Sequence, residues 1–174
     1  MRARSGRRIG AVLAATTILG LAAPAAVRAV DVTEKQEVSA AAFQQLSGNA
    51  SAHLGYYLVG PGHFVAPLDL PAEATVTRLT AFVEDQATGV FETMSLSLYK
   101  TKPSTFTQTL MAQLTSADGI DGIQAPTTTN IASARVGGGA AVYLDLVLPS
   151  TVQPIYFTGA RVVYTVPAAL SPTR

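Results

Sequence analysis

Apolar and polar residues alternate along several short stretches of this chain, and the first clear case runs from 92 to 99. Alternate positions of that stretch hold Met94, Leu96 and Leu98. Because successive side chains of an extended chain point to opposite sides, this spacing predicts a strand with one buried face. The stretch 75–83 is rich in β-branched and aromatic residues and also predicts a strand. Polar turn residues lie between the two stretches, so we expect them to form an antiparallel pair.

Two stretches near the C-terminus show the same period of two. The apolar parity of the stretch 142–148 carries Val142, Leu144, Leu146 and Leu148. The stretch 155–166 has Phe157 and then Ala160, Val162, Tyr164 and Val166 on one face, with Gly159 between them allowing a bulge. We expect the apolar residues of 94–98 and of 142–148 to point inward from facing β layers.

Shorter strands are predicted in the rest of the mature chain. They are the stretches 54–59, 64–70, 108–115 and 124–132. Proline cannot donate to a strand ladder, so Pro67 and Pro71 predict an edge strand or a loop at 64–70. On 108–115 we expect Leu110, Ala112 and Leu114 to share the buried face.

These patterns predict an all-β fold. About eight strands follow one another without a long helix, which favours antiparallel pairing and leaves no room for the helices of parallel crossovers. We therefore predict an antiparallel β-sandwich of the jelly-roll or Greek-key type over residues 53–167. Residues 30–52 are expected to form an N-terminal arm that docks through Val38 and Phe43, and 168–174 a tail.

The first 29 residues are typical of a cleaved signal peptide. Four arginines within the first eight residues precede an apolar run from 9 to 23, and small residues stand near the end of the segment. We expect cleavage after Ala29, or alternatively after Ala25 or Ala26. The alternative is a retained membrane anchor, but the apolar run of about 15 residues is shorter than the roughly 20 that a spanning helix needs. We therefore expect the segment to be cleaved and the mature chain to have no membrane span.

Export would place the mature protein in the periplasm or outside the cell. Arg7-Arg8 leaves both the twin-arginine and the general secretory route open. The chain has 12 lysines and arginines against 11 aspartates and glutamates, and five of the basic residues lie in the leader. The mature chain is therefore mildly acidic, which argues against nucleic acid as a partner. Cysteine is absent, so disulfides and thiolate chemistry are excluded.

Several short motifs of this chain resemble those of a widespread group of uncharacterised bacterial secreted β-sandwich proteins. The motifs are AAF at 41–43, FVAPLDLPAEATVT at 64–77, FVED at 82–85, SLSLY at 95–99 and FTGARVVYT at 157–165. The resemblance covers most of residues 38–166 and implies an exported, jelly-roll-like sandwich. Glu73 stands where the group usually has glycine in the turn before a strand. Because the group has no established activity, the resemblance implies no function.

Candidate metal ligands are few. His53 and His63 are ten residues apart, a spacing that fits no compact ligand motif, so we expect two solvated loop histidines. Asp118 and Asp121 share a loop with two glycines, as ligands of calcium often do, but two carboxylates are few for this ion. We predict no metal and no cofactor, and leave calcium at Asp118 and Asp121 open.

Candidate catalytic groups are equally sparse. Glu84, Asp85 and Glu92 lie close together in the sequence, and two carboxylates held roughly 5 to 9.5 Å apart can cleave glycosides. Solvated acids at a turn are the simpler interpretation. The chain has no G-x-S-x-G elbow and no phosphate-binding glycine loop. We predict that the protein is not an enzyme, with a carboxylate-dependent hydrolase as the weakest of three hypotheses.

Four tyrosines, Tyr56, Tyr57, Tyr99 and Tyr143, are the candidate ligand-binding residues. They fall on or near the polar faces of their predicted strands, where tyrosine rings can stack on sugars or fill a subunit interface. The absence of tryptophan counts against a sugar platform.

Our leading prediction is an exported, non-catalytic structural or adhesive domain that acts through its surface. Self-association through an exposed face bearing Val147 and Val163 would be typical of such a sandwich. The main alternative is a glycan-binding module that uses the tyrosines and loop carboxylates, so that a glycan or a cell surface is its partner.

Overall fold

A computed structural model of the chain describes residues 31–47, 52–53, 56–86, 93–117, 121–151 and 153–168. The predicted signal peptide lies outside the described residues. The described part of the chain contains no helix with the length and hydrophobicity that crossing a membrane requires.

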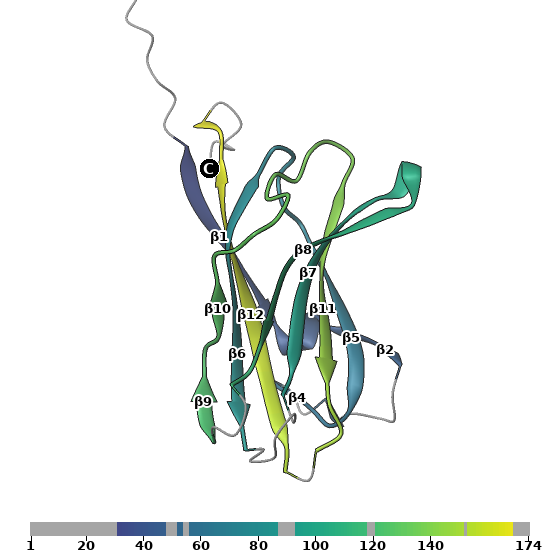
Figure 1. The fold of residues 1–174 in the computed structure, drawn as a ribbon, viewed down its shortest axis with the longest axis vertical. Helices are drawn as coiled ribbons and strands as arrows, with labels where there is room; N and C mark the ends of the chain where they lie inside the picture. The colour runs from purple at the N-terminus through teal and green to yellow at the C-terminus, as the bar shows by residue number, and fades with distance from the viewer. Residues whose placement is uncertain are drawn as a thin grey trace, which may run out of the picture.

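The described strands form two antiparallel sheets, which Figure 1 shows stacked face to face. Sheet A contains β1 (Val32–Ser39), β3 (Ala52–His53), β4 (Leu58–Val59), β6 (Thr75–Asp85), β9 (Gly122–Gln124), β10 (Thr127–Thr128) and β12 (Ile155–Val166). Sheet B contains β2 (Gln44–Ser47), β5 (Gly62–Leu68), β7 (Ser95–Lys102), β8 (Thr107–Thr115) and β11 (Ala141–Leu148). Two short 3-10 turns, η1 (Ala40–Ala42) and η2 (Pro103–Thr105), accompany them. The predicted all-β antiparallel sandwich is confirmed.

One core fills the space between the sheets. From sheet B the alternate residues Leu96, Leu98, Leu144 and Leu146 are fully buried. From sheet A they meet Leu79, Phe157 and Val162, which are also fully buried. Fully burying one such side chain stabilises a fold by roughly 1.5 to 3 kcal/mol, so these two faces hold the sheets together without disulfides.

Two predicted strand relationships are wrong. β6 pairs with β12, β9 and β10, whereas β7 pairs with β11 and β8, so the two stretches predicted as a hairpin belong to different sheets. β7 and β11 are neighbours in sheet B rather than facing layers. Alternation reports which side of a strand is buried and says nothing about its hydrogen-bonded neighbour, because both sheets bury their inner faces in the same core.

The segment predicted as an arm contributes to both sheets. β1 pairs with β12 over eight residues, and β2 pairs with β5. Val38 and Phe43 are buried, as predicted, and the ring of Phe43 meets that of Phe157 edge-to-face at 5.0 Å. The N-terminal segment therefore closes one side of the sandwich.

β5 lies between β2 and β11, so the prediction of an edge strand or a loop at 64–70 is wrong. The proline is nevertheless placed where a strand tolerates it. β2 pairs with β5 only from His63 to Val65, which leaves Pro67 with β11 as its one neighbour. A missing backbone donor at that position removes no ladder bond on the open side.

Leu110 does not share the buried face predicted for it. It is 43% exposed, while Met111 takes the inward position. The pairing of β7 with β8 skips Met111, so Leu110 is opposite the outward-facing Tyr99 and lies on the outer face.

Two backbone positions of sheet A and the turn before it are unusual. The predicted bulge at Gly159 is present, and a Cβ there would lie 2.6 Å from the carbonyl oxygen of Val38 on β1. Glu73, which replaces the glycine of the resembling group, has a φ of 71° in the left-handed region. The carboxylate of Glu73 pairs with Arg135, which helps to hold the turn before β6.

Candidate functional site

The structure separates the four candidate tyrosines into two clusters. Tyr56 and Tyr57 directly precede β4 at one end of sheet A. Tyr99 and Tyr143 lie on β7 and β11, on the outer face of sheet B. The four candidate ligand-binding residues therefore belong to two outer surfaces of the sandwich.

Tyr56 and Tyr57 line a cavity of about 300 Å³, which we call the tyrosine cavity. Its other lining residues are Glu84, Gln86, Tyr156 and Thr158. Figure 1 shows the elements that carry them, β4, the end of β6 and the start of β12, meeting at the lower end of the sandwich. Tyr156 alternates with the buried Ile155 and Phe157, which places its ring on the outer face.

The three rings of the tyrosine cavity form a chain of edge-to-face contacts. The ring centroids of Tyr56 and Tyr57 are 5.1 Å apart, and so are those of Tyr57 and Tyr156, with interplanar angles of 76° and 86°. This arrangement is a favourable one for aromatic pairs. Tyr56 is 78% exposed, so much of its ring remains available to a ligand.

Polar groups flank these rings. The side-chain nitrogen of Gln86 donates to Oε1 of Glu84 at 3.1 Å. The hydroxyl of Thr158 donates to the carbonyl oxygen of Phe82, also at 3.1 Å. Aromatic rings together with a few fixed polar groups are a common arrangement in small-molecule sites.

Glu84 and Asp85 do not form the carboxylate pair that a hydrolase would need. They are successive residues of β6, so their side chains point to opposite faces of sheet A. Glu84 is exposed at the tyrosine cavity, whereas Asp85 is 1% exposed on the inner face. Glu92, the third acid of that hypothesis, lies outside the described residues.

A second hollow of about 330 Å³ adjoins the tyrosine cavity and shares Thr158 with it. It runs between β1, β6 and β12, with Glu37, Phe82 and Gly159 in its lining. The guanidinium carbon of Arg161 lies 5.1 Å from the ring centroid of Phe82. The two hollows therefore extend the candidate site along the outer face of β12.

The charges beside the second hollow are paired. Oε1 of Glu37 lies 3.2 Å from Nζ of Lys35 and 2.9 Å from Nη2 of Arg161. Hydrogen bonds from Lys35 and, after it, from Arg161 lower the pKa of Glu37 below its usual range. Glu37 therefore stays ionised and helps to hold Arg161 over Phe82.

The second cluster has a different geometry. Tyr99 and Tyr143 are directly opposite in the register of β7 and β11, and their rings stack at 5.6 Å with an angle of 22°. The side-chain nitrogen of Gln108 donates to the hydroxyl of Tyr143 at 2.5 Å. Burial, followed by the nearby Asp145 and Tyr99, raises the pKa of Tyr143.

The remaining candidates do not gather into a site. His63 lies 2.7 Å from Asp145 on the outer face of sheet B. The side chain of His53 and the whole of Asp118 lie outside what the structure describes. Calcium binding at Asp118 and Asp121 therefore stays an open alternative. Among the described residues, no group of three or more histidines, cysteines, aspartates or glutamates is placed to hold a metal ion.

Val147 and Val163 do not lie on one exposed face. Val147 is on the outer face of β11 in sheet B, whereas Val163 is on β12 in sheet A. The outer faces of a two-layer sandwich point in opposite directions, so the prediction of one interface bearing both valines is wrong. Self-association itself stays a prediction.

No family model and no curated protein sequence matches this chain. Solved structures with a similar arrangement of strands are found, among them a carbohydrate-binding module CBM36 in complex with calcium and xylotriose. That module is 10% identical, with a TM-score of 0.47 over 72% of this chain and 97% of the module. The C-terminal CBM6 of LamC, a marine laminarinase from Zobellia galactanivorans, is 10% identical, with a TM-score of 0.46 over 74% and 98%.

The similar structures are not all carbohydrate-binding modules. The Stig cyclase Fisc from Fischerella sp. TAU is 15% identical, with a TM-score of 0.44 over 86% of this chain and 82% of the cyclase. Similarity at this level assigns neither a family nor a function, so the function has to be argued from the residues of this chain.

Sequence reasoning missed Tyr156, which joins Tyr57 to the outer face of sheet A. A signal for it was present, because Tyr156 has the opposite parity to Phe157 and must face outward if Phe157 is buried. What the pattern could not give is the neighbour of Tyr156, since β4 and β12 pair across about one hundred residues of sequence.

Proposed function

We propose that this protein is a non-catalytic glycan-binding domain, and that the tyrosine cavity is its binding site. The proposal keeps the non-catalytic part of the leading sequence prediction and adopts the alternative in place of a purely structural or adhesive surface. The observation that carries it is the chain of three tyrosine rings beside a cavity with Glu84, Gln86 and Thr158.

The chemistry of the cavity suits a sugar. A sugar ring presents apolar C–H faces and equatorial or axial hydroxyls, and it needs an aromatic surface for the former and hydrogen-bonding groups for the latter. Tyrosine supplies a large apolar face and a polar hydroxyl in one side chain. A carboxylate and an amide, such as those of Glu84 and Gln86, can accept from and donate to hydroxyls.

The second hollow supports a ligand longer than one ring. Because it shares Thr158 with the tyrosine cavity, an extended chain can pass from Tyr156 toward Phe82 along β12. Export through the predicted signal peptide belongs to the same proposal, since an exported domain would meet polysaccharides outside the cytoplasm.

The test is a glycan array probed with the mature protein, followed by calorimetry on the strongest neutral oligosaccharide. We expect Tyr156→Ala and Tyr57→Ala each to weaken binding about tenfold, which corresponds to about 1.4 kcal/mol. Tyr99→Ala is the matched control, because it removes a tyrosine from the outer face of sheet B and should leave the affinity unchanged. An array without binding, or equal losses for all three variants, would contradict the proposal.

A further inference from the structure

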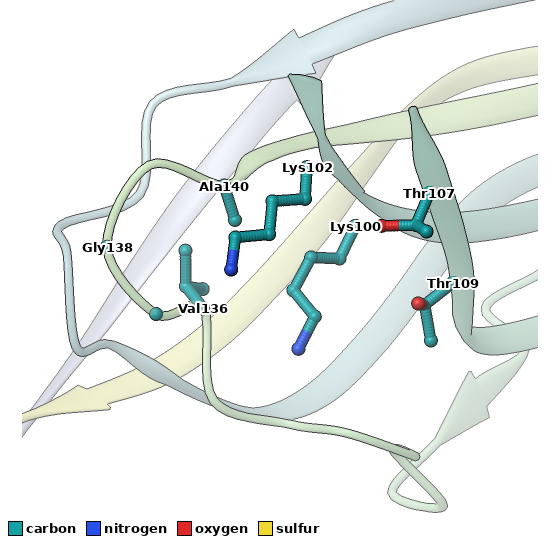
Figure 2. Close-up of a pocket in the computed structure, with 8 residues that line it drawn as sticks. Lys100, Lys102, Thr107, Thr109, Val136, Gly138 and Ala140 are labelled. Carbon is teal, nitrogen blue, oxygen red and sulfur yellow. The ribbon is translucent and has the colours of Figure 1, made fainter. Parts of the chain in front are cut away.

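A third cavity lies at the opposite end of the sandwich from the tyrosine cavity. It has a volume of about 220 Å³ and lies between the tip of the β7–β8 hairpin and the loop 136–140. Lys100, Lys102, Thr107 and Thr109 belong to its lining. Figure 2 shows both lysine side chains between the loop and the strand that carries the two threonines. We call this cavity the lysine pocket.

The alternation of β7 explains why lysines occupy this position. Leu96 and Leu98 are buried on the inner face of sheet B, and Lys100 and Lys102 continue the same parity. Lys100 is directly opposite Thr109 on β8, and Lys102 is opposite Thr107. The inner face of the hairpin therefore ends in four polar side chains where the hydrophobic core stops.

The charge in the lysine pocket has one sign. Its lining contains two lysines and no aspartate or glutamate. Positions i and i+2 of a strand are roughly 6.7 Å apart along the chain, which is less than the Debye length of about 8 Å at physiological salt. Two like charges on the same side of one strand repel each other, and an anion bound between the two side chains would relieve that repulsion.

One ammonium group is fixed in place and the other is available. Nζ of Lys100 donates to the carbonyl oxygens of Ser133 at 3.0 Å and Arg135 at 2.8 Å. An ammonium group has three donors, so Lys100 keeps one for a ligand. Within the part of the chain that the structure describes, the ammonium group of Lys102 makes no hydrogen bond or ion pair, whereas its carbonyl oxygen accepts from the hydroxyl of Thr105.

The covering loop allows a ligand to approach its backbone. Gly137 and Gly138 line the pocket, and Gly137 has a φ of 49°. A Cβ at either glycine would have no other atom within 4 Å, so the space above these residues is open. The small volume suits one compact group rather than a drug-sized ligand.

We propose that the lysine pocket binds a single oxyanion group, either the carboxylate of an acidic sugar or a free phosphate ion. Lys100 supplies a pre-positioned positive charge, Lys102 swings in as the second donor, and the threonine hydroxyls complete the polar wall. This site is separate from the tyrosine cavity and does not depend on the function proposed for it.

The experiment is an NMR titration of the full chain with sodium glucuronate, with glucose as the uncharged analogue and with inorganic phosphate. Saturable shifts of the Gly137 and Gly138 amides are expected with glucuronate, with phosphate or with both, and not with glucose. Shifts with glucuronate alone identify a sugar acid as the ligand, and shifts with phosphate alone identify the free ion.

Lys102→Gln is expected to reduce the affinity for the anion at least tenfold. Among the described residues this variant loses no side-chain hydrogen bond, and its amide spectrum verifies the fold. Lys35→Gln is the control, because it removes the same charge from β1 in sheet A and should not change the affinity. Tyr57→Ala should also leave anion binding intact, so this test and that of the tyrosine cavity can fail separately. Absence of saturable shifts with both anions, equal shifts with glucose, or equal losses in Lys102→Gln and Lys35→Gln would overturn the proposal.

Discussion

The two tyrosine clusters lie on opposite outer faces of one sandwich and differ in what their rings contact. Tyr99 and Tyr143 are direct cross-strand neighbours with nearly parallel rings, so each ring covers a face of the other. In the tyrosine cavity the rings of Tyr57 and Tyr156 are nearly perpendicular, and a space of about 300 Å³ remains beside them.

This difference shows how strand register decides the role of an exposed aromatic residue. Directly opposite residues on an antiparallel pair have Cβ atoms about 5 Å apart and contribute to sheet stability together. Tyr56 and Tyr57 precede a strand of two residues, and only the ring of Tyr57 contacts that of Tyr156, edge-to-face. We therefore expect the Tyr99–Tyr143 cluster to matter for stability and the tyrosine cavity to matter for binding.

The largest effect on stability is expected from a substitution beside the tyrosine cavity. A methyl group at Gly159 would lie 2.6 Å from the carbonyl oxygen of Val38, so β1 or the bulge beside Thr158 must shift. We expect Gly159→Ala to destabilise the fold by about 1 to 3 kcal/mol in urea unfolding, and to weaken glycan binding.

Gly138→Ala is the matched control for that substitution. A Cβ at Gly138 meets no atom within 4 Å, so its effect on the free energy of unfolding should stay within about 0.5 kcal/mol. Equal stabilities of the two variants would show that the bulge absorbs the added methyl group.

The second prediction tests the assignment of stability to the stacked pair. Tyr143→Ala removes a cross-strand ring contact and the acceptor for Gln108, and should cost about 1 to 2 kcal/mol of unfolding free energy. Tyr56→Ala removes a ring that is 78% exposed, and should change stability by less than about 0.5 kcal/mol. The reverse order in chemical denaturation would reverse our division of roles.

The smallest effect concerns the ionisation of Tyr143. Burial, then Asp145, then Tyr99 raise its pKa, so the folded state holds the phenolic proton more tightly than the unfolded chain does. The resulting stabilisation is fully present below the ordinary pKa of tyrosine and is lost as the pH rises through the raised pKa. A phenolate absorbance titration of the chain and of Tyr143→Phe should reveal one late-titrating group that the variant lacks. A difference curve centred at the ordinary pKa would argue against the partial burial of this hydroxyl as a cause of a shift.

The sequence was sufficient for the class of fold because period-two alternation depends only on which side of a strand is buried. The stretches 142–148 and 155–166 fall on β11 and β12, and their predicted inner residues are buried. The sequence pattern did not predict which strands are hydrogen-bonded neighbours. β6 and β7 follow each other in the chain but belong to different sheets, and no local pattern distinguishes a hairpin from a crossing between layers.

The residues of the candidate sites come together only through the order of the strands in the sheets. Tyr56 and Tyr57 could be selected as outward tyrosines, yet Glu84 and Tyr156 join them only because β6, β12 and β4 are neighbours. The strand predicted at 92–99 continues in the structure to Lys102, and Lys100 and Lys102 lie on the same side of β7 as Leu96 and Leu98. A strand that continues beyond the core exchanges its apolar residues for polar ones, so the loss of hydrophobicity alone does not mark its end.

The pairing of Val32 with Val166 brings the first and last described strands together at one pole of the sandwich (Figure 1). Tyr156 lies ten residues before Val166 on the same strand, which is roughly 33 Å away along an extended chain. A neighbouring domain, fluorescent label or solid support joined through either end of the sandwich would therefore attach at the far pole. The tyrosine cavity would then project away from the attachment point, and immobilised protein should retain the glycan binding proposed for that cavity.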